Sequence, residues 1–195
     1  MRGAKTYTLM QNPNITLIKL NQENLTELVE FSRTTFEISY SKDNTRENMD
    51  RYLNSVFCED QLGKELMNEH SEFYFTKYND ETAGYIKINT GNAQTDFKEP
   101  IGMELERIYV LDKFQGKKIG GQMIDFTVLE AEKRGLEYVW LGVWQINTRA
   151  INFYKRNGFE IVGTHPFKMG DEVQTDYIMK RKVKDISPPL KIEGL

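Results

Sequence analysis

The sequence predicts an α/β domain in which helices flank a mixed, mostly antiparallel central sheet that contains a parallel βαβ pair. Apolar runs around Leu105 and Leu141 are joined by a helical pattern, and such a crossover joins strands that lie parallel. Alternating runs before and after this unit, at 73–89 and 159–183, predict antiparallel pairs. The chain has 195 residues, so these elements are expected to share one core.

The first 70 residues predict one strand and three helical pieces. Alternation over 15–20 indicates the strand, and Asn21 is a suitable N-cap for the helical spacing that follows it. Thr45 is expected to cap a second helix, and a third helix is expected over 60–68. These helices therefore precede the main part of the sheet.

A β-hairpin and a long connection come next. The alternating runs 73–78 and 83–89 flank the turn residues 79–82, which predicts a hairpin. Residues 90–102 contain two glycines and Pro100, and they form a connection longer than most in compact domains. Two interpretations stay open for it: a functional or mobile loop, and an excursion without a role.

The stretch 104–121 joins a strand to a turn that opens into a helix, expected over 122–134. The first-turn amides of a helix lack acceptors and lie at the positive end of its dipole, so they bind anions. The turn carries three glycines and two lysines: Gly116, Gly120, Gly121, Lys117 and Lys118. Small residues and positive charge suit a diphosphate, whereas a plain turn before a surface helix is the alternative.

The last third of the chain predicts a buried strand, a short helix and a closing pair of strands. Residues 138–144 suit a strand buried on both faces, and Asn147 is expected to cap the next helix. An antiparallel pair over 159–164 and 175–183 is expected to enclose a loop with Pro166 and Gly170. We expect one domain over residues 1–184 and a tail over residues 185–195, with Pro188 and Pro189, outside the core.

Charge and composition exclude several classes of protein. The net charge of -3 argues against a nucleic-acid partner and is compatible with a cationic substrate. Cys58 is the single cysteine, which excludes an internal disulfide and fits a reducing cytosol. Neither a signal peptide nor a membrane-length apolar run is present, so we expect a cytoplasmic protein with no membrane partner. His70 and His165 are too separated to indicate a metal site, and each is expected on the surface or in a loop.

Three segments resemble the GNAT N-acetyltransferases: Leu-Glu-Arg-Ile-Tyr-Val at 105–110, Gln-Gly-Lys-Lys-Ile-Gly at 115–120, and the segment 147–159. The order of elements over 15–183 resembles the acyl-CoA N-acyltransferase fold of that family. The stretch 35–45, followed by Phe-Tyr-Phe, resembles the PaiA-type branch, whose members acetylate spermidine and spermine. The resemblance implies transfer of an acetyl group from acetyl-CoA to a primary amine of a small cationic acceptor such as spermidine or spermine. Transfer to a protein or peptide α-amine, and a non-catalytic acyl-CoA-binding regulatory module, are the alternatives.

The resemblance also implies where acetyl-CoA binds. The family pattern Gln/Arg-x-x-Gly-x-Gly/Ala falls on Gln115, Lys118 and Gly120, so a lysine replaces the middle glycine. A side chain there need not block the site if it points outward from the helix start and the backbone keeps helical dihedrals. The implied cofactor-binding residues are Ile108, Tyr109, Val110, Gln115, Gly116, Lys117, Lys118, Ile119, Gly120, Gly121, Asn147 and Lys155. For Asn147 helix capping, and for Lys155 a solvated helix charge, remain the alternatives.

The chemistry of acetyl transfer to an amine requires a base. An alkylammonium has a pKa of about 10.4, so at neutral pH it must lose a proton before it attacks a thioester. Glu104 and Glu106 lie two apart on one strand, which places both carboxylates on one face near the expected thioester. Either could accept the proton, whereas pairing with Arg107 or solvation of the sheet is the alternative.

Further roles follow from the resemblance. Tyr154 matches a tyrosine that often protonates the departing thiolate in this family, and a core aromatic is the alternative. A strand amide near Tyr109 is placed to stabilise the oxyanion. Acceptor binding is expected from an aromatic-rich set in the first helices that includes Phe36, Tyr40 and Asn44, although such residues also suit a core. Family members often form homodimers, so a second copy is a candidate partner beside the amine and acetyl-CoA.

Overall fold

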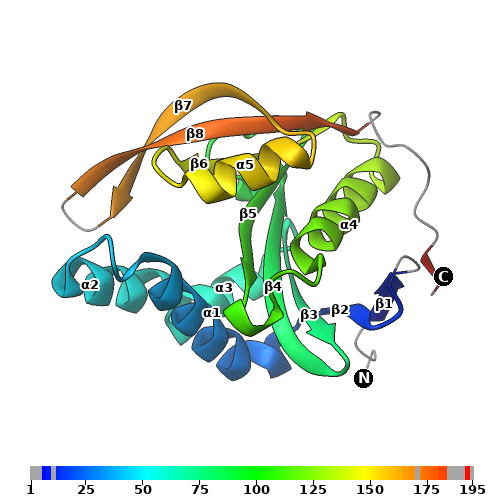
Figure 1. Cartoon of the computed structure of the whole chain (residues 1–195), viewed down its shortest axis with the longest axis horizontal. Coiled ribbons are helices and arrows are strands. Elements are labelled where there is room, and N and C mark those ends of the chain that lie inside the picture. Colours follow the sequence, from blue (N-terminus) through cyan, green and yellow to red (C-terminus); the bar gives the residue numbers. More distant parts are fainter. Residues whose placement is uncertain (1–5, 10–11, 170–171, 184–191, 194–195) are drawn as a thin grey trace.

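One mixed sheet runs through the molecule (Figure 1). The computed structural model describes residues 6–9, 12–169, 172–183 and 192–193. The strands in these residues are β1 (Thr6–Leu9), β2 (Ile15–Lys19), β3 (Ser71–Tyr78), β4 (Glu81–Thr90), β5 (Gly102–Val110), β6 (Tyr138–Trp144), β7 (Glu160–Met169), β8 (Glu172–Lys182) and β9 (Ile192–Glu193). Their spatial order is β7-β8-β6-β5-β4-β3-β2-β1-β9, and among these strands β5 and β6 alone pair in parallel. The predicted mixed sheet with a parallel βαβ pair is therefore confirmed.

Five α-helices of the described residues accompany the sheet: α1 (Leu25–Tyr40), α2 (Arg46–Val56), α3 (Glu59–Met67), α4 (Ile119–Lys133) and α5 (Thr148–Arg156). Thr45 caps α2 by accepting a hydrogen bond from the backbone N–H of Asn48, and Asn147 caps α5 in the same way. Helix α4 begins three residues before the expected start, because Gly120 and Gly121 belong to its first turn. No helix in the described part of the chain is both long and apolar enough to cross a membrane.

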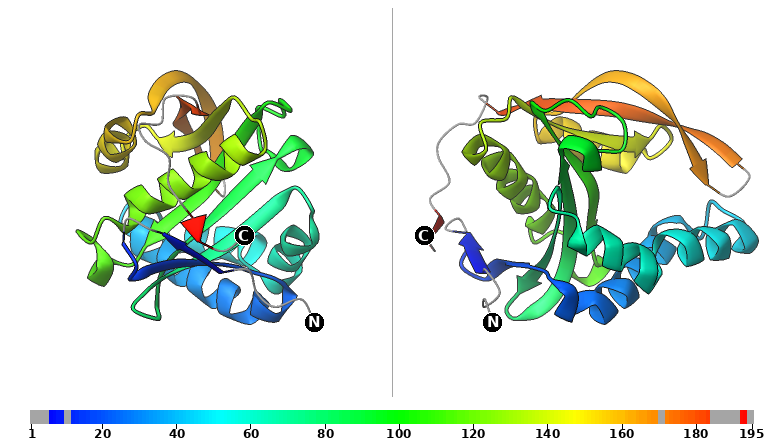
Figure 2. Two further views of the ribbon diagram at one scale, coloured as in Figure 1. Left: turned by 90° about the vertical axis from the view of Figure 1, so that its right-hand side faces the viewer. Right: turned by 180° about the vertical axis from the view of Figure 1, so that it is seen from behind.

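Helices cover both faces of the sheet (Figure 2). On one face Phe73, Phe75 and Tyr85 pack against α1, α2 and α3. On the other face Ile86 and Leu105 pack against α4 and α5. This alternation along β3, β4 and β5 follows from the two-residue repeat of a strand, and it gives the molecule two cores separated by the sheet.

The parallel pairing of β5 and β6 is short, and the two strands separate beyond it. Strand β5 pairs with β6 only over 102–104, opposite 138–140. Beyond these residues β5 stays paired with β4, whereas β6 stays paired with β8. The two strands therefore diverge, and the backbone groups on the β6 side of the second half of β5 have no strand beside them.

Several boundaries differ from the prediction. The hairpin turn between β3 and β4 has two residues, Asn79 and Asp80, both with positive φ. Pro166 lies within β7, not in a loop, and an edge strand tolerates a residue without an N–H. Gly170 lies outside the described residues, as do Pro188 and Pro189. Strand β1 was not predicted, and β9, from the expected tail, pairs with it at the far edge of the sheet.

Candidate active site

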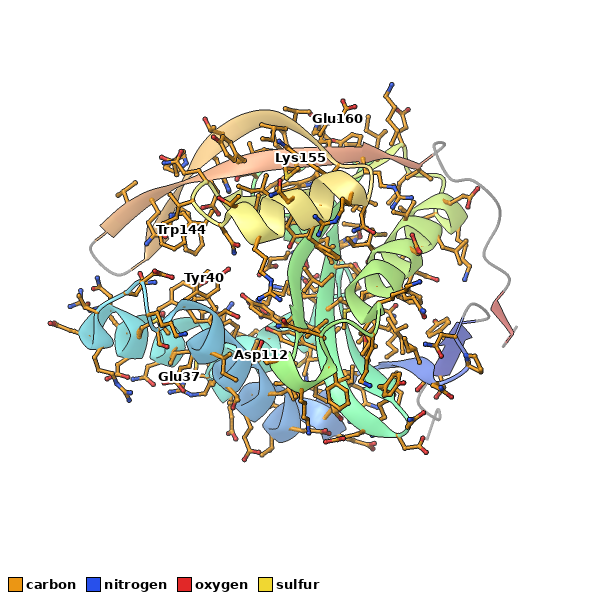
Figure 3. All side chains as sticks on the ribbon, in the orientation of Figure 1. Glu37, Tyr40, Asp112, Trp144, Lys155 and Glu160 are labelled. Carbon is orange, nitrogen blue, oxygen red and sulfur yellow. The ribbon has the colours of Figure 1, made fainter. Side chains whose placement is uncertain are left out.

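A cavity of about 700 Å³ opens where β5 and β6 diverge. Helices α1 and α2 form one wall, and α5 with β7 and β8 forms the other. Figure 3 shows Tyr40 of α1 and Trp144 at the end of β6 on the two sides of this opening, and both line the cavity. A volume of this size is in the range of sites for cofactors and small substrates.

The two glutamates proposed as bases lie on the floor of the cavity. Strand β5 carries a bulge at Glu106, between the regular pairs that Leu105 and Arg107 make with β4. The side-chain amide of Asn89 donates to a carboxylate oxygen of Glu104 (3.0 Å) and to one of Glu106 (2.5 Å). The bulge therefore brings Glu104, Glu106 and Arg107 to the same side of the sheet.

Glu106 belongs to a buried network of charges. Its carboxylate contacts Lys87 Nζ at 2.6 Å and Arg107 Nη2 at 3.0 Å, and both cations also contact Glu65. Burial acts to raise the pKa of Glu106, but the charges of Arg107 and Lys87 outweigh it and lower the pKa to about 2. With both oxygens engaged and a low pKa, Glu106 is a poor acceptor for an ammonium proton.

Glu104 fastens the 90–102 connection to the sheet. Its carboxylate accepts hydrogen bonds from the backbone N–H of Thr95 (2.9 Å) and from the Thr95 hydroxyl (2.5 Å). Gln94 is buried in the same connection and accepts a hydrogen bond from Trp140 Nε1 (2.7 Å). The connection is thus an ordered wall of the cavity and not an excursion. Burial and the neighbouring charge of Glu106 raise the pKa of Glu104.

Tyr154 reaches the cavity from α5, where it is 9% exposed. Burial and then the proximity of Tyr40 raise its pKa, so the hydroxyl keeps its proton at neutral pH. Tyr40 in turn shares a hydrogen bond with Tyr109 of β5. The three tyrosines place hydroxyl groups at the junction of the two walls, where they can donate hydrogen bonds to a thiolate or an oxyanion.

The turn predicted to bind the diphosphate leads into α4, and Lys118 has an unusual backbone conformation there. Lys118 precedes the helix with φ of 62°, in the left-handed region, so the condition of helical dihedrals is not met. The turn needs this conformation to enter the helix, and glycine adopts it freely, whereas other residues pay about 1 kcal/mol. The Lys118 side chain is exposed, as is that of Lys117, which lies over the Tyr78 ring at 4.8 Å.

Helix α5 packs onto the start of α4. A Cβ added to Gly120 would lie 3.0 Å from the Phe153 ring, so an alanine there would require the ring to shift. Lys155 lies two positions beyond Phe153, on the opposite face of α5, which turns it away from this turn. Arg149 instead donates a hydrogen bond to the Gln115 side chain, so it is the basic residue that α5 brings to the turn. Sequence reasoning missed it.

The expected acceptor residues divide into two groups. Phe36 and Tyr40 line the cavity, and the Phe36 ring stacks on Tyr52 with centroids 4.7 Å apart. Asn44 does not line it: the side chain donates to the Tyr40 backbone carbonyl (2.9 Å) and accepts from Gln174 (3.2 Å). Asn44 thus ties the end of α1 to β8.

A cluster of three polar side chains in the cavity was not predicted. His165 was expected on the surface or in a loop, but it lies in β7, lines the cavity and contacts both Asp96 and Asp176. No signal in the sequence could have joined these residues, because Asp96 is far away along the chain. Among the described residues, no group of three or more His, Cys, Asp or Glu is arranged to hold a metal ion.

Comparisons with known proteins agree with this geometry. The sequence model of the acetyltransferase (GNAT) family matches residues 25–159. An uncharacterized N-acetyltransferase from Lactobacillus delbrueckii subsp. lactis is 37% identical over 171 residues, which cover 86% of this chain and 96% of that protein. The spermidine N(1)-acetyltransferase of Thermoplasma acidophilum is 25% identical over 177 residues, covering 87% of this chain and 98% of that protein.

A solved structure shares the fold over most of the chain. The crystal structure of the PaiA N-acetyltransferase from Thermoplasma acidophilum, in complex with coenzyme A, superposes with a TM-score of 0.71. It is 23% identical in sequence, and the match covers 86% of this chain and 98% of that one. The overall fold of this chain is therefore shared with that structure.

Proposed function

This chain belongs to the GNAT family of acetyltransferases and uses acetyl-CoA, and we propose that its acceptor is a primary amine of a small polycation such as spermidine or spermine. The charge of the cavity carries the proposal. Six carboxylates line it: Glu65, Asp96, Glu104, Glu106, Asp112 and Asp176. Lys87 and Arg107 form ion pairs with Glu65 and Glu106, and the other four form none with a lysine or arginine of the described residues. Such a surface attracts and holds cations. The similarity to a spermidine N(1)-acetyltransferase supports the same acceptor class.

The divergence of β5 and β6 supports a position for acetyl-CoA. Ile108 and Val110 present free strand edge to the cavity, so their backbone groups are suited to pair with the pantetheine arm. The amides from Gln115 to Gly121 then meet the diphosphate at the start of α4, with Arg149 beside Gln115. Asn147 caps α5 through its oxygen, and we propose that its amide nitrogen bonds the same arm.

Tyr154 is placed to assist departure of the thiolate. Its raised pKa makes it a hydrogen-bond donor that holds its proton until negative charge develops on the sulfur. Thiol groups have a pKa near 8.5, so the leaving group needs less assistance than the amine, whose proton is held with a pKa of about 10.4. Phe36, Tyr40 and Tyr52 form an aromatic wall of the cavity, which suits the aliphatic part of an amine.

An acceptor panel tests the proposal. The protein is incubated with acetyl-CoA and spermidine, spermine, free lysine or a peptide with a free α-amine, and release of free thiol is followed. We expect the two polyamines to give the highest kcat/KM. Turnover of the peptide with no turnover of the polyamines would overturn the acceptor class and favour a peptide α-amine acetyltransferase.

A further inference from the structure

His165 and Asp176 form a cross-strand pair on the cavity side of β7 and β8. His165 Nε2 lies 3.8 Å from Asp176 Oδ2, and His165 Nδ1 is bonded to Asp96 of the 90–102 connection. Three separate segments therefore converge on one imidazole ring. The contact with Asp96 fixes the ring so that Nε2 points toward Asp176.

Two atoms of this cluster are buried without a hydrogen-bond partner: His165 Nε2 and Asp176 Oδ1. A buried polar atom without a partner is costly and uncommon, and it is often kept for a functional contact. The other two acidic candidates differ in this respect, because both oxygens of Glu104 and both oxygens of Glu106 have partners. Of these three carboxylates, Asp176 is thus the one with a free acceptor atom; Glu65 Oε2 also lacks a hydrogen bond but contacts Lys87 and Arg107.

The surroundings of Asp176 connect it to the expected reaction centre. Gly142 of β6 leaves the room that the pair occupies, since a Cβ there would lie 3.0 Å from His165 Nε2 and 3.6 Å from Asp176 Oδ2. The negative charge of Asp176 helps to raise the pKa of Tyr40. Tyr40 in turn helps to raise the pKa of Tyr154. Asp176 also lines the same cavity as Tyr40 and Tyr154, whose hydroxyls are proposed to meet the thioester.

We propose that Asp176 is the general base for the acceptor amine and that His165, fixed by Asp96, is its positioning residue; this inference rests on the proposed small-amine acceptor. The ammonium group transfers one proton to the Asp176 carboxylate, and the neutral amine then attacks the thioester carbonyl carbon. The tetrahedral intermediate collapses with cleavage of the C–S bond. The thiolate takes the Tyr154 proton, and the second proton of the former amine restores Tyr154. Asp176 releases its proton to solvent after each turnover.

The protonation behaviour of Asp176 is consistent with this role. Burial raises its pKa to about 6, while the proximity of His165 acts in the opposite direction. The titratable groups that face it among the described residues are His165 of β7, Tyr40 of α1 and, through His165, Asp96. At neutral pH the carboxylate is mostly ionised, and a base with a pKa near the working pH is efficient.

The test compares pH profiles of kcat/KM for the wild type and Asp176→Asn. In the wild type we expect a rise centred near pH 6 and then a plateau, because Asp176 removes the ammonium proton. In Asp176→Asn we expect a loss of about 10² or more at pH 7. Its remaining activity should rise tenfold per pH unit toward the amine pKa of about 10, since only free amine then reacts. Asp60→Asn, on the exposed face of α3, is the matched control with an unchanged profile.

The variant His165→Gln tests the positioning role. Because His165 lowers the pKa of Asp176, its removal should move the midpoint of the profile to higher pH while the plateau remains. A residue that only supports the fold would lower the whole profile without moving the midpoint. An Asp176→Asn enzyme that keeps the wild-type plateau and midpoint would overturn the assignment of the base.

The two proposals fail in different ways. If the wild type acetylates the peptide but not the polyamines, the acceptor class is wrong, and the pH profiles are measured with the peptide. If it acetylates neither, the side-chain carboxyl carbon of Asp176 is titrated by ¹³C NMR and assigned by its absence in Asp176→Asn. We expect a midpoint near pH 6. A midpoint near the ordinary aspartate value of about 3.9 would overturn the proposal.

Discussion

Gly84 of β4 lies so close to Tyr109 of β5 that a Cβ at Gly84 would overlap the Tyr109 carbonyl oxygen. The same Cβ would lie 2.7 Å from the terminal methyl of Met123 on α4. Since Gly84 pairs with Val110, this contact sets the path of β5 where the strand borders the cavity. A backbone atom cannot move aside as a flexible side chain can.

The substitution Gly84→Ala should therefore destabilise the fold by about 2 kcal/mol or more, because β5 must shift away from β4. It should also raise the KM for acetyl-CoA, since the edge proposed for the pantetheine arm moves. Urea unfolding and steady-state kinetics measure both effects. Gly163→Ala is the control, because its Cβ would have Ile178 Cδ1 at 3.8 Å, an ordinary contact.

Replacing Glu106 by Gln should cost about 3 kcal/mol at pH 7, because Lys87 and Arg107 stay buried with less negative charge nearby. The folded pKa of Glu106 is lowered to about 2 from a usual 4.5, so its stabilisation is present above about pH 4.5 and is lost as the pH falls through 2. The difference between wild type and variant, measured by urea unfolding, should shrink from pH 7 to pH 3. A difference that is constant with pH would contradict the ionic origin.

Removal of the Tyr154 hydroxyl in Tyr154→Phe should lower kcat by about 10² and leave the affinity for CoA nearly unchanged. The ring fills the same space, so the effect isolates the hydroxyl proposed to serve the thiolate. Single-turnover kinetics and calorimetric CoA binding separate the two quantities. Tyr7→Phe, remote from the cavity, should keep full activity, whereas wild-type kcat in Tyr154→Phe would reassign Tyr154 to packing.

Two substitutions at Lys118 separate its charge from its backbone conformation. Both Lys118→Ala and Lys118→Gly remove the charge, but alanine keeps the strain of a positive φ and glycine relieves it. The glycine variant should be more stable by about 1 kcal/mol in urea unfolding. Equal stability of the two variants would indicate that the turn can adopt another conformation. Both should bind CoA more weakly at low salt, since a cation near the diphosphate is lost.

The stability of Asp176→Asn should depend on pH in the opposite sense to that of Glu106→Gln. The folded pKa of Asp176 is raised from 3.8 to about 6, so the folded state binds more protons between these values and wild-type stability falls as the pH rises. The difference between a pKa of 3.8 and one of about 6 corresponds to about 3 kcal/mol. Thermal unfolding should show a more stable variant at pH 8 and little difference at pH 4. A variant less stable than the wild type at pH 8 would contradict this sign.

Local signals in the sequence predicted most of the fold. The caps at Thr45 and Asn147 were identified because a cap depends on residues three positions away. The parallel pairing of β5 and β6 followed from one crossover helix. The prediction of a loop at Pro166 was wrong. A proline interrupts a strand only where its missing N–H would face a neighbouring strand, and β7 is an edge strand with no neighbour on its outer side.

The residues of the candidate site also divide into those that local sequence signals indicate and those that only the tertiary structure brings together. The sequence alone singled out the turn proposed to bind the diphosphate, Tyr154 and the pair of glutamates, since each lies within a contiguous strand, turn or helix. Only the tertiary structure decided that Glu106 is held by Lys87 and Arg107, because these contacts depend on a bulge and on neighbouring strands. It also brought Asp96, His165 and Asp176 together. The order of the strands sets which distant side chains meet, and no spacing along the chain encodes that proximity.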